Sequence, residues 1–166
     1  MKRSPPCRSL RLLLIENDPH DALLVHAALS ATRDESSSSF ELIHVIHANR
    51  LSAALRRLEK GGIDVVLMGL SWPDPDSQRT PPCNILQAEA PGVPLVVLTR
   101  HEHENIEREA KGKGAEEYLG KDRLDGSTLS RALHRAIEHQ QVRLALERLE
   151  RDTRTRDARA VTSASR

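Results

Sequence analysis

The sequence has 166 residues, enough for one domain with a single buried core. Its 25 Lys and Arg and 24 Asp and Glu give a net charge of +1, so charge alone does not favour a nucleic-acid or membrane partner. Two cysteines are too few for a disulfide framework, and no apolar run approaches the ~20 residues of a membrane span. These features favour a reduced, cytoplasmic setting.

Two polar segments are predicted to lie outside the packed core. Residues 1–8, "MKRSPPCR", combine basic residues with Pro-Pro and lack the cleavage-site pattern of a secretory signal, so we expect a flexible lead-in. Residues 34–39, "DESSSS", are too polar and serine-rich to pack and predict an exposed loop. The folded domain is expected to span residues 9–140.

The first strand is predicted at residues 10–15, a run that is mostly apolar, and the first helix at 19–31. Asp18 and Pro19 supply an N-cap and a proline at the first helical position, which is a typical helix start. Three residues are expected to form the apolar stripe of this helix: Leu23, Ala27 and Ala28.

A second strand is predicted at residues 40–46 and a second helix at 50–60. Asn49 is placed to cap this helix, and Gly61-Gly62 is expected to end it. Its sheet-facing side is predicted to hold four apolar residues: Leu51, Ala54, Leu55 and Leu58.

The rest of the domain continues the alternation of strands and helices. Strands are predicted at 63–68, 95–99 and, more weakly, 117–119, and helices at 82–90 and 103–111. Most of the strand runs lack polar alternation, as burial on both faces of a parallel sheet requires. The third strand lies in the stretch "DVVLMGLSWPD" and ends at Gly69, which has no side chain.

Five strands that alternate with helices predict an α/β fold with a parallel sheet. Short connections and the lack of a sixth strand favour a flavodoxin-like doubly wound sheet of order 2-1-3-4-5. The site of such a fold lies beyond the carboxyl ends of strands one and three. Here those ends are "IEND" (15–18) and "LMGL" (67–70).

A last helical pattern begins near residue 124 and contains no Gly or Pro after Gly126. We expect a helical extension at 141–158 and a disordered tail at 159–166. Beyond the domain, three apolar residues step by four and three, as in one short coiled-coil seam: Val142, Leu146 and Leu149. Self-association through this seam is one prediction, and a solvated extension is the alternative, because two heptads are marginal alone.

Four stretches closely resemble the receiver domains of response regulators (CheY-like), over about residues 9–140: "LLLIENDPHDALLV", "GGIDVVLMGLSWPD", "VPLVVLT" and "GAEEYLGKDRLDG". In such receivers, an acidic pair after strand one and an aspartate after strand three hold Mg²⁺. That aspartate then accepts a phosphoryl group from a histidine kinase. The chemistry requires carboxylates, because Mg²⁺ prefers their oxygens and an aspartyl phosphate needs a carboxylate nucleophile.

Matched position by position, the resemblance implies a role for six residues: the acidic pair at Glu16 and Asn17, the phospho-acceptor at Gly69, the switch hydroxyl at Thr99, the switch aromatic at Tyr118 and the phosphate-pairing lysine at Lys121. Two of the three acidic positions have lost their carboxylate. The charges of Glu16 and Lys121 sum to zero, so Mg²⁺ binding is expected to be weak or absent. The sequence predicts a degenerate pseudo-receiver, without cofactor or metal, that cannot be phosphorylated at Gly69.

Other acidic residues leave an atypical phospho-accepting regulator as the alternative function. Asp74 or Asp76 could replace the acceptor, but an extended loop can carry them ~15 to 25 Å from the strand end, so turn formation is favoured. Asp18 could act as a surrogate metal ligand, although an N-cap is its favoured role. The eight histidines show no zinc-site spacing.

Lys121 is expected to pair with Glu16 across the vacant pocket, with an unknown anion site as the alternative. Asp122 follows Lys121 where many receivers have a proline with a cis peptide bond. A cis bond before a non-proline residue costs ~2.5 to 4 kcal/mol, so we expect a trans bond.

A phosphate-independent module that binds a protein partner, an attached output domain or a second copy is the favoured function. The resemblance implies a partner surface on the fourth helix, fifth strand and fifth helix, with Tyr118 at its edge. No nucleophile–base pair, cofactor loop or metal cluster occurs, so we expect no enzymatic activity. Nucleic-acid binding by the arginine-rich tail is weakly supported, because only 2% of the residues are aromatic.

Overall fold

The computed structural model describes residues 9–32, 40, 42–69, 82–99 and 115–164, with side chains up to residue 156. Several predictions concern residues outside these ranges: the lead-in at 1–8, the loop at 34–39, the helix at 103–111, and the surrogate acceptors Asp74 and Asp76.

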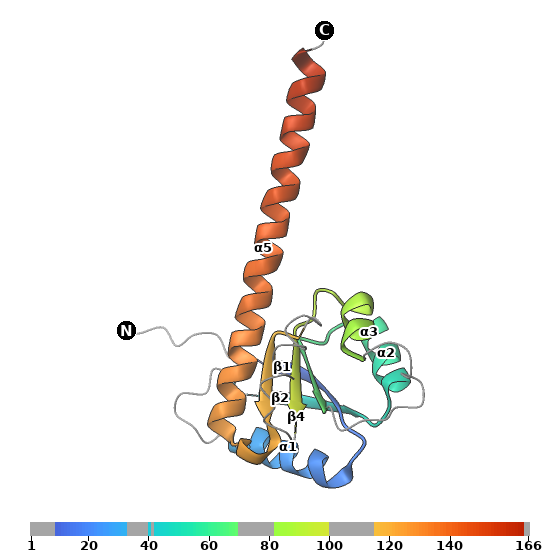
Figure 1. Ribbon diagram of the computed structural model, residues 1–166, viewed down its shortest axis with the longest axis vertical. Helices are drawn as coiled ribbons and strands as arrows, with labels where there is room; N and C mark the ends of the chain where they lie inside the picture. The colour runs from blue at the N-terminus through green and yellow to red at the C-terminus, as the bar shows by residue number, and fades with distance from the viewer. Residues whose placement is uncertain (1–8, 33–39, 41, 70–81, 100–114, 165–166) are drawn as a thin grey trace, which may run out of the picture.

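The described core is a five-stranded parallel sheet of order β2-β1-β3-β4-β5, as predicted (Figure 1). The strands are β1 (Ser9–Ile15), β2 (Leu42–Ala48), β3 (Val65–Gly69), β4 (Leu95–Thr99) and β5 (Glu117–Gly120). Their ends differ from the expected ones by at most two residues. Phe40, expected to begin β2, lies before the strand and is buried in the core.

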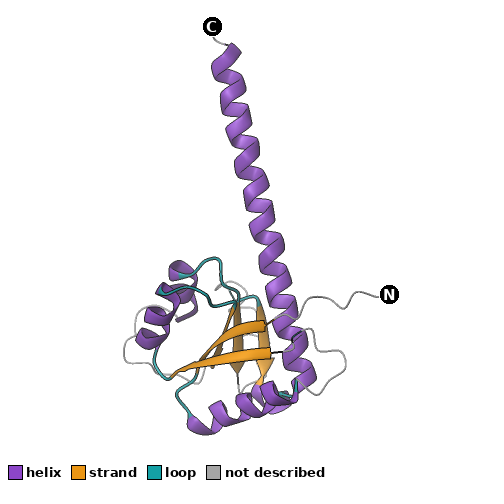
Figure 2. Ribbon diagram, turned by 180° about the vertical axis from the view of Figure 1, so that it is seen from behind, coloured by secondary structure: helices purple, strands orange, loops and turns teal. Residues whose placement is uncertain are grey.

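Helices cover both faces of the sheet (Figures 1 and 2). Alternate residues of β1 point to opposite faces, because side chains of a strand alternate. Leu12 and Leu14 pack with α1 (Pro19–Ala31) and α5 (Gly126–Ala164). Leu13 and Ile15 pack with α2 (Leu51–Glu59) and α3 (Pro82–Glu89) on the other face. Burial on both sides explains why β3 and β4 are almost entirely apolar.

Helix α1 has the predicted bounds but turns a different face to the core. Asp18 caps it by accepting hydrogen bonds from the backbone N–H groups of His20 (2.8 Å) and Asp21 (3.2 Å). The predicted apolar stripe was wrong at two of its three positions, since Leu23 is 67% exposed and Ala27 is also exposed. The buried apolar residues are Ala22, Val25, Ala28 and Leu29, which recur at helical spacing.

Helix α2 begins one residue later than expected. Arg50 is therefore the N-cap residue, without a side-chain capping bond, and the predicted cap at Asn49 was wrong. The predicted sheet-facing residues are confirmed, with Leu51 and Ala54 buried and Leu55 and Leu58 packed beside them. Gly61 and Gly62 follow the helix with φ of 70° and 74°, which glycine adopts without steric cost.

Helix α5 begins at Gly126, after the short 3₁₀ helix η2 (Lys121–Arg123). Its first half packs against the sheet and α1, and its second half projects away from the domain (Figures 1 and 2). The buried residues of the first half include Leu129, Leu133, Ala136, Ile137 and Gln140.

The projecting half of α5 corrects the predicted boundary at residue 158. The helix continues to Ala164, into the segment expected to be disordered, and residues 159–164 contain no Gly or Pro that would end it. None of the described helices, α5 included, has an apolar stretch long enough to cross a membrane.

Candidate functional site

The candidate site lies where the parallel strands end. Ile15 of β1 is paired in register with Met68 of β3, so Glu16 and Gly69 follow side by side at the same edge. Strand β5 ends at Gly120, and Lys121 follows it at this edge. Glu16 and Lys121 are both buried, with Glu16 fully inaccessible.

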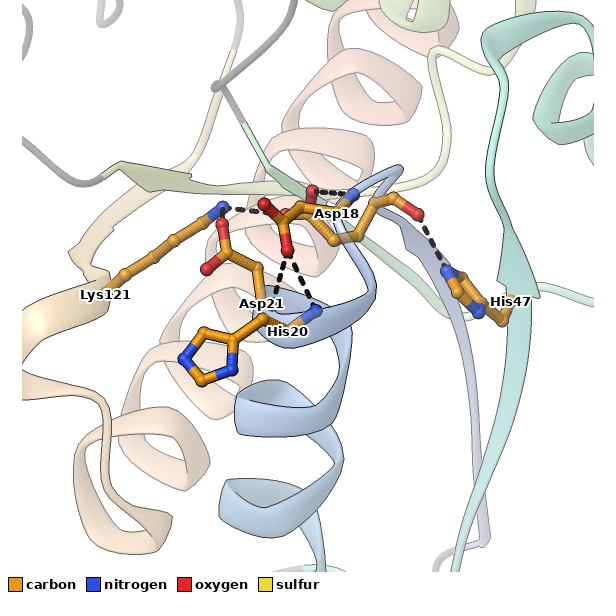
Figure 3. A network of polar contacts seen from close by, with 6 residues as sticks. Asp18, His20, Asp21, His47 and Lys121 are labelled. Carbon is orange, nitrogen blue, oxygen red and sulfur yellow. Dashed lines mark hydrogen bonds and ion pairs between the residues drawn. The ribbon is translucent and has the colours of Figure 1, made fainter.

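Glu16 is held through its backbone and through both carboxylate oxygens. Figure 3 labels three of its partners, Asp18, His47 and Lys121. The N–H of Glu16 donates to the carbonyl of Ala48 (3.1 Å), and its carbonyl accepts from Nε2 of His47 (2.8 Å), which therefore carries the proton. Oε1 accepts from the backbone N–H of Asp18 (3.0 Å). Oε2 accepts from Nζ of Lys121 (2.7 Å), so neither oxygen is left without a donor.

Lys121 joins two buried carboxylates rather than one. Its Nζ donates to Oε2 of Glu16 at 2.7 Å and to Oδ2 of Asp21 at 2.6 Å (Figure 3). The expected pair with Glu16 is thus present, whereas Asp21 was missed. The sequence did contain a signal for Asp21. It lies three residues after the cap Asp18, in the first turn of α1, and this turn lies at the same edge of the sheet as Lys121. The three charges sum to −1 rather than to zero.

Gly69 faces a space that is already filled. A Cβ built on this residue would lie 2.0 Å from Oε2 and 2.8 Å from Cδ of Glu16, and 3.1 Å from Nζ of Lys121. The carboxylate of Glu16 therefore occupies the position in which a side chain of residue 69 would begin. We call the space beside the Cα of Gly69 the acceptor corner. It is filled by the side chain of Glu16, the residue that directly follows β1.

The residues at this edge do not fit Mg²⁺. Gly69 offers no side-chain donor, Asn17 is exposed, and both oxygens of Glu16 are engaged by an ammonium and an N–H group. Among the described residues, no group of three or more His, Cys, Asp or Glu is placed to hold a metal ion. The Lys121 ammonium supplies the positive charge that the two buried carboxylates require.

The other predicted pocket residues belong to α1, β4 and β5. Asp18 caps α1, and Thr99 ends β4 in register with Gly120, the residue before Lys121. Tyr118 is half-buried, and burial together with the nearby Cys83 thiol raises the pKa of its phenol. No cis peptide bond occurs among the described residues, so the bond before Asp122 is trans, as expected.

The three residues of the predicted coiled-coil seam lie beyond the opposite end of the domain. Gln140 donates from Nε2 to the carbonyl of Pro91 (2.9 Å), and Arg143 pairs with Glu116 (2.8 Å). Pro91 and Glu116 precede β4 and β5, so α5 leaves the domain at the amino ends of these strands. Beyond that point three apolar residues are exposed: Val142 at 60%, Leu146 at 55% and Leu149 at 63%.

Comparison with known proteins gives structural matches only. No protein-family model matches the sequence, and no curated protein matches it. The signal receiver domain of an HD domain-containing protein from Pseudomonas fluorescens is 20% identical, with a TM-score of 0.64, over 87% of this chain and 98% of that one. A response regulator receiver domain protein from Clostridium thermocellum is 20% identical, with a TM-score of 0.62, over 80% and 98%.

A third structure is the receiver domain of a sensor histidine kinase from Pseudomonas aeruginosa, with a magnesium ion coordinated in its active site cleft. It is 22% identical, with a TM-score of 0.60, over 79% of this chain and 99% of that one. At these identities the likeness establishes the fold: a flavodoxin-like, CheY-like receiver fold with a long C-terminal helix.

Proposed function

We propose that this chain is a pseudo-receiver, a receiver-like module of two-component signalling that acts through protein contacts and without phosphorylation. The observation that carries this proposal is the filled acceptor corner beside Gly69, where Glu16 lies paired with Lys121. The receiver fold of its structural neighbours supports a place in a bacterial signalling pathway, in the cytoplasm.

The chemistry of phosphoryl transfer supports this proposal. An aspartyl phosphate forms when an accessible carboxylate oxygen attacks the phosphorus atom, with Mg²⁺ to neutralise the developing charge. Gly69 has no such oxygen, and the carboxylate of Glu16 is fully buried with both oxygens hydrogen-bonded. The pocket therefore lacks nucleophile, metal site and access, and we expect no enzymatic activity.

Helix α5 is the proposed output element. Its attachment through Gln140 and Arg143 fixes the direction in which it leaves the domain. A protein partner or an attached output domain would receive the signal through this helix, together with the β5 surface that carries Tyr118.

A second copy of the chain is the proposed partner of the projecting half of α5. Val142, Leu146 and Leu149 are exposed at the four-and-three spacing of a two-stranded coiled coil, whereas the apolar residues earlier in α5 are buried in the domain. Pairing would bring two output partners together.

Incubation with a small acyl phosphate and Mg²⁺, followed by intact-mass measurement, tests the absence of phosphorylation. A phosphorylatable receiver treated in parallel shows that the reagent works. We expect an unchanged mass for this chain. A stable added phosphoryl group would instead support the atypical phospho-accepting regulator, and peptide mapping would distinguish Asp74, Asp76 and Glu16 as the acceptor.

A further inference from the structure

We infer that Glu16 has taken over, in space and in charge, the place of the carboxylate that residue 69 would bring from β3. The two positions then compete for one corner, and the pocket opens only when both are changed. This inference rests on the proposed function, and it identifies Glu16 as the residue that keeps the pocket closed.

The competition for space follows from distances. The site of a Cβ on residue 69 lies 2.0 Å from Oε2 of Glu16, far inside the ~3.5 Å at which non-bonded atoms attract each other. Glu16 has little freedom to withdraw, because its backbone bonds to Ala48 and His47 and its side chain bonds to Asp18 and Lys121. Any side chain at position 69 must therefore displace the carboxylate of Glu16.

The replacement of charge follows from the contact with Lys121. Glu16 reaches the lysine at 2.7 Å from the end of β1, and the Cβ site of residue 69 lies 3.1 Å from the same nitrogen. An aspartate at 16 would be shorter by one methylene, which withdraws its carboxylate from the corner by ~1.5 Å. Glutamate at 16 and glycine at 69 thus form one matched pair.

A double-mutant cycle tests the competition directly. Gly69→Ala is made in the wild-type, Glu16→Gln and Glu16→Ala backgrounds, and the denaturant midpoint of unfolding is measured for each. We expect Gly69→Ala to lower the midpoint in the first two backgrounds, because glutamine fills the same space as glutamate. In Glu16→Ala, most of this loss should vanish.

Gly92→Ala is the matched control, since a Cβ there meets nothing within 4 Å, and its effect should be the same in all backgrounds. An equal loss from Gly69→Ala in the wild-type and Glu16→Ala backgrounds would overturn the inference. Glu16→Asp, which keeps the charge, provides the same comparison if Glu16→Ala does not fold.

Acyl phosphate labelling with Mg²⁺ tests the reopening of the pocket. We expect no label on Gly69→Asp alone, and a label at residue 69 in the triple variant Glu16→Asp, Asn17→Asp, Gly69→Asp. Equal labelling of the single and triple variants, or no labelling of either, would contradict this reopening.

The two proposals fail separately. Labelling of the wild-type chain would overturn the proposed function and leave the coupling of residues 16 and 69 intact. Lack of coupling in the double-mutant cycle would overturn the role of Glu16, with the wild-type chain still unlabelled.

Discussion

At the scale of single residues, Lys121 is the centre of the site. Burying an ammonium group is costly unless nearby groups compensate for the lost water, and here two carboxylates lie 2.7 and 2.6 Å from its Nζ. The excess negative charge is partly offset at Asp21, which lies in the first turn of α1, where the helix dipole is positive. Lysine thus has the electrostatic role that a metal ion has in other acidic pockets.

Replacing Lys121 by methionine should therefore destabilise the fold strongly. The substitution leaves the carboxylates of Glu16 and Asp21 buried together without a cation, which costs about 3–5 kcal/mol when one partner of a buried pair is removed. Urea unfolding gives this difference. Arg135→Met is the control, because Arg135 is mostly exposed in its pair with Glu117, and such pairs contribute about 1 kcal/mol or less. Equal losses for the two variants would contradict the buried cluster.

The sequence could predict the pair of Glu16 and Lys121 but not the whole cluster. Both residues follow strands of a parallel sheet, and those ends meet at one edge. Asp21 was missed because its burial depends on the rotation of α1, which the sequence left ambiguous. The filled corner depends on the rotamer of Glu16, which only the packed surroundings determine.

At the scale of elements, α1 and α5 approach each other at Gly126. A Cβ there would lie 2.9 Å from the carbonyl carbon of Ala31 and 3.0 Å from the backbone nitrogen of Thr32. This contact lets the end of α1 lie against the start of α5, close in sequence to Lys121.

Gly126→Ala should force the two helices apart. We expect a loss of about 1–3 kcal/mol, the usual range for overpacking, in the free energy of unfolding. Gly92→Ala, with open space around its Cβ, should change stability far less. A loss no larger than that of the control would show that α1 and α5 do not pack this closely.

The start of α5 should also respond to pH through Asp125. The backbone N–H of Thr128 donates to its carboxylate (2.7 Å) and, with the Thr128 and Ser127 side chains, lowers its pKa below the ordinary 3.8. A lowered folded-state pKa means that the unfolded chain binds the proton more readily, so the carboxylate stabilises the fold above pH 3.8. That contribution is lost as the pH falls through the folded-state pKa.

Thermal unfolding of Asp125→Asn across the acidic range checks this expectation. The difference from wild type should be largest near neutral pH and should shrink below pH 3.8. Asp152→Asn, on the projecting half of α5, controls for the loss of one carboxylate. A difference for Asp125→Asn that is the same at all pH values would contradict the capping interaction.

The sequence predicted the positions of the strands and helices better than it predicted the buried face or the N-cap of each helix. Apolar runs located β1, β3 and β4 clearly, since burial on both sides requires them, whereas the signal for the short β5 was weak. Helix α1 has apolar residues on both sides, including the exposed Leu23 and Leu24, so the pattern did not identify its buried face. Asp18 was a clear cap because Pro19 follows it, whereas Asn49 had no such neighbour and lies one residue outside the cap.

At the scale of the whole molecule, α5 connects the domain that contains Lys121 to the projecting segment with the exposed apolar seam. It begins five residues after Lys121, against the end of α1, and leaves the domain near Gln140 at the amino ends of β4 and β5. Figure 1 shows one continuous helix over this distance. A module with its pocket closed in this way would present the projecting helix in one fixed direction.

Light scattering at several protein concentrations tests pairing through that helix. We expect a dimer mass for the full chain, and a monomer mass for Leu146→Glu and for a truncation after Gln140, because each removes the apolar seam. Thr155→Glu adds the same charge to the exposed helix off the seam and should remain dimeric. A monomer mass for the wild-type chain at every concentration would exclude the second copy as partner.

The most direct test of the filled corner is a crystal structure grown with Mg²⁺ and beryllium fluoride, which mimics a phosphoryl group on a carboxylate. The expected density shows Oε2 of Glu16 against Nζ of Lys121, with neither metal nor fluoride beside Gly69. Density for Mg²⁺ and beryllium fluoride in that corner, with Lys121 turned towards them, would contradict a pocket closed by Glu16.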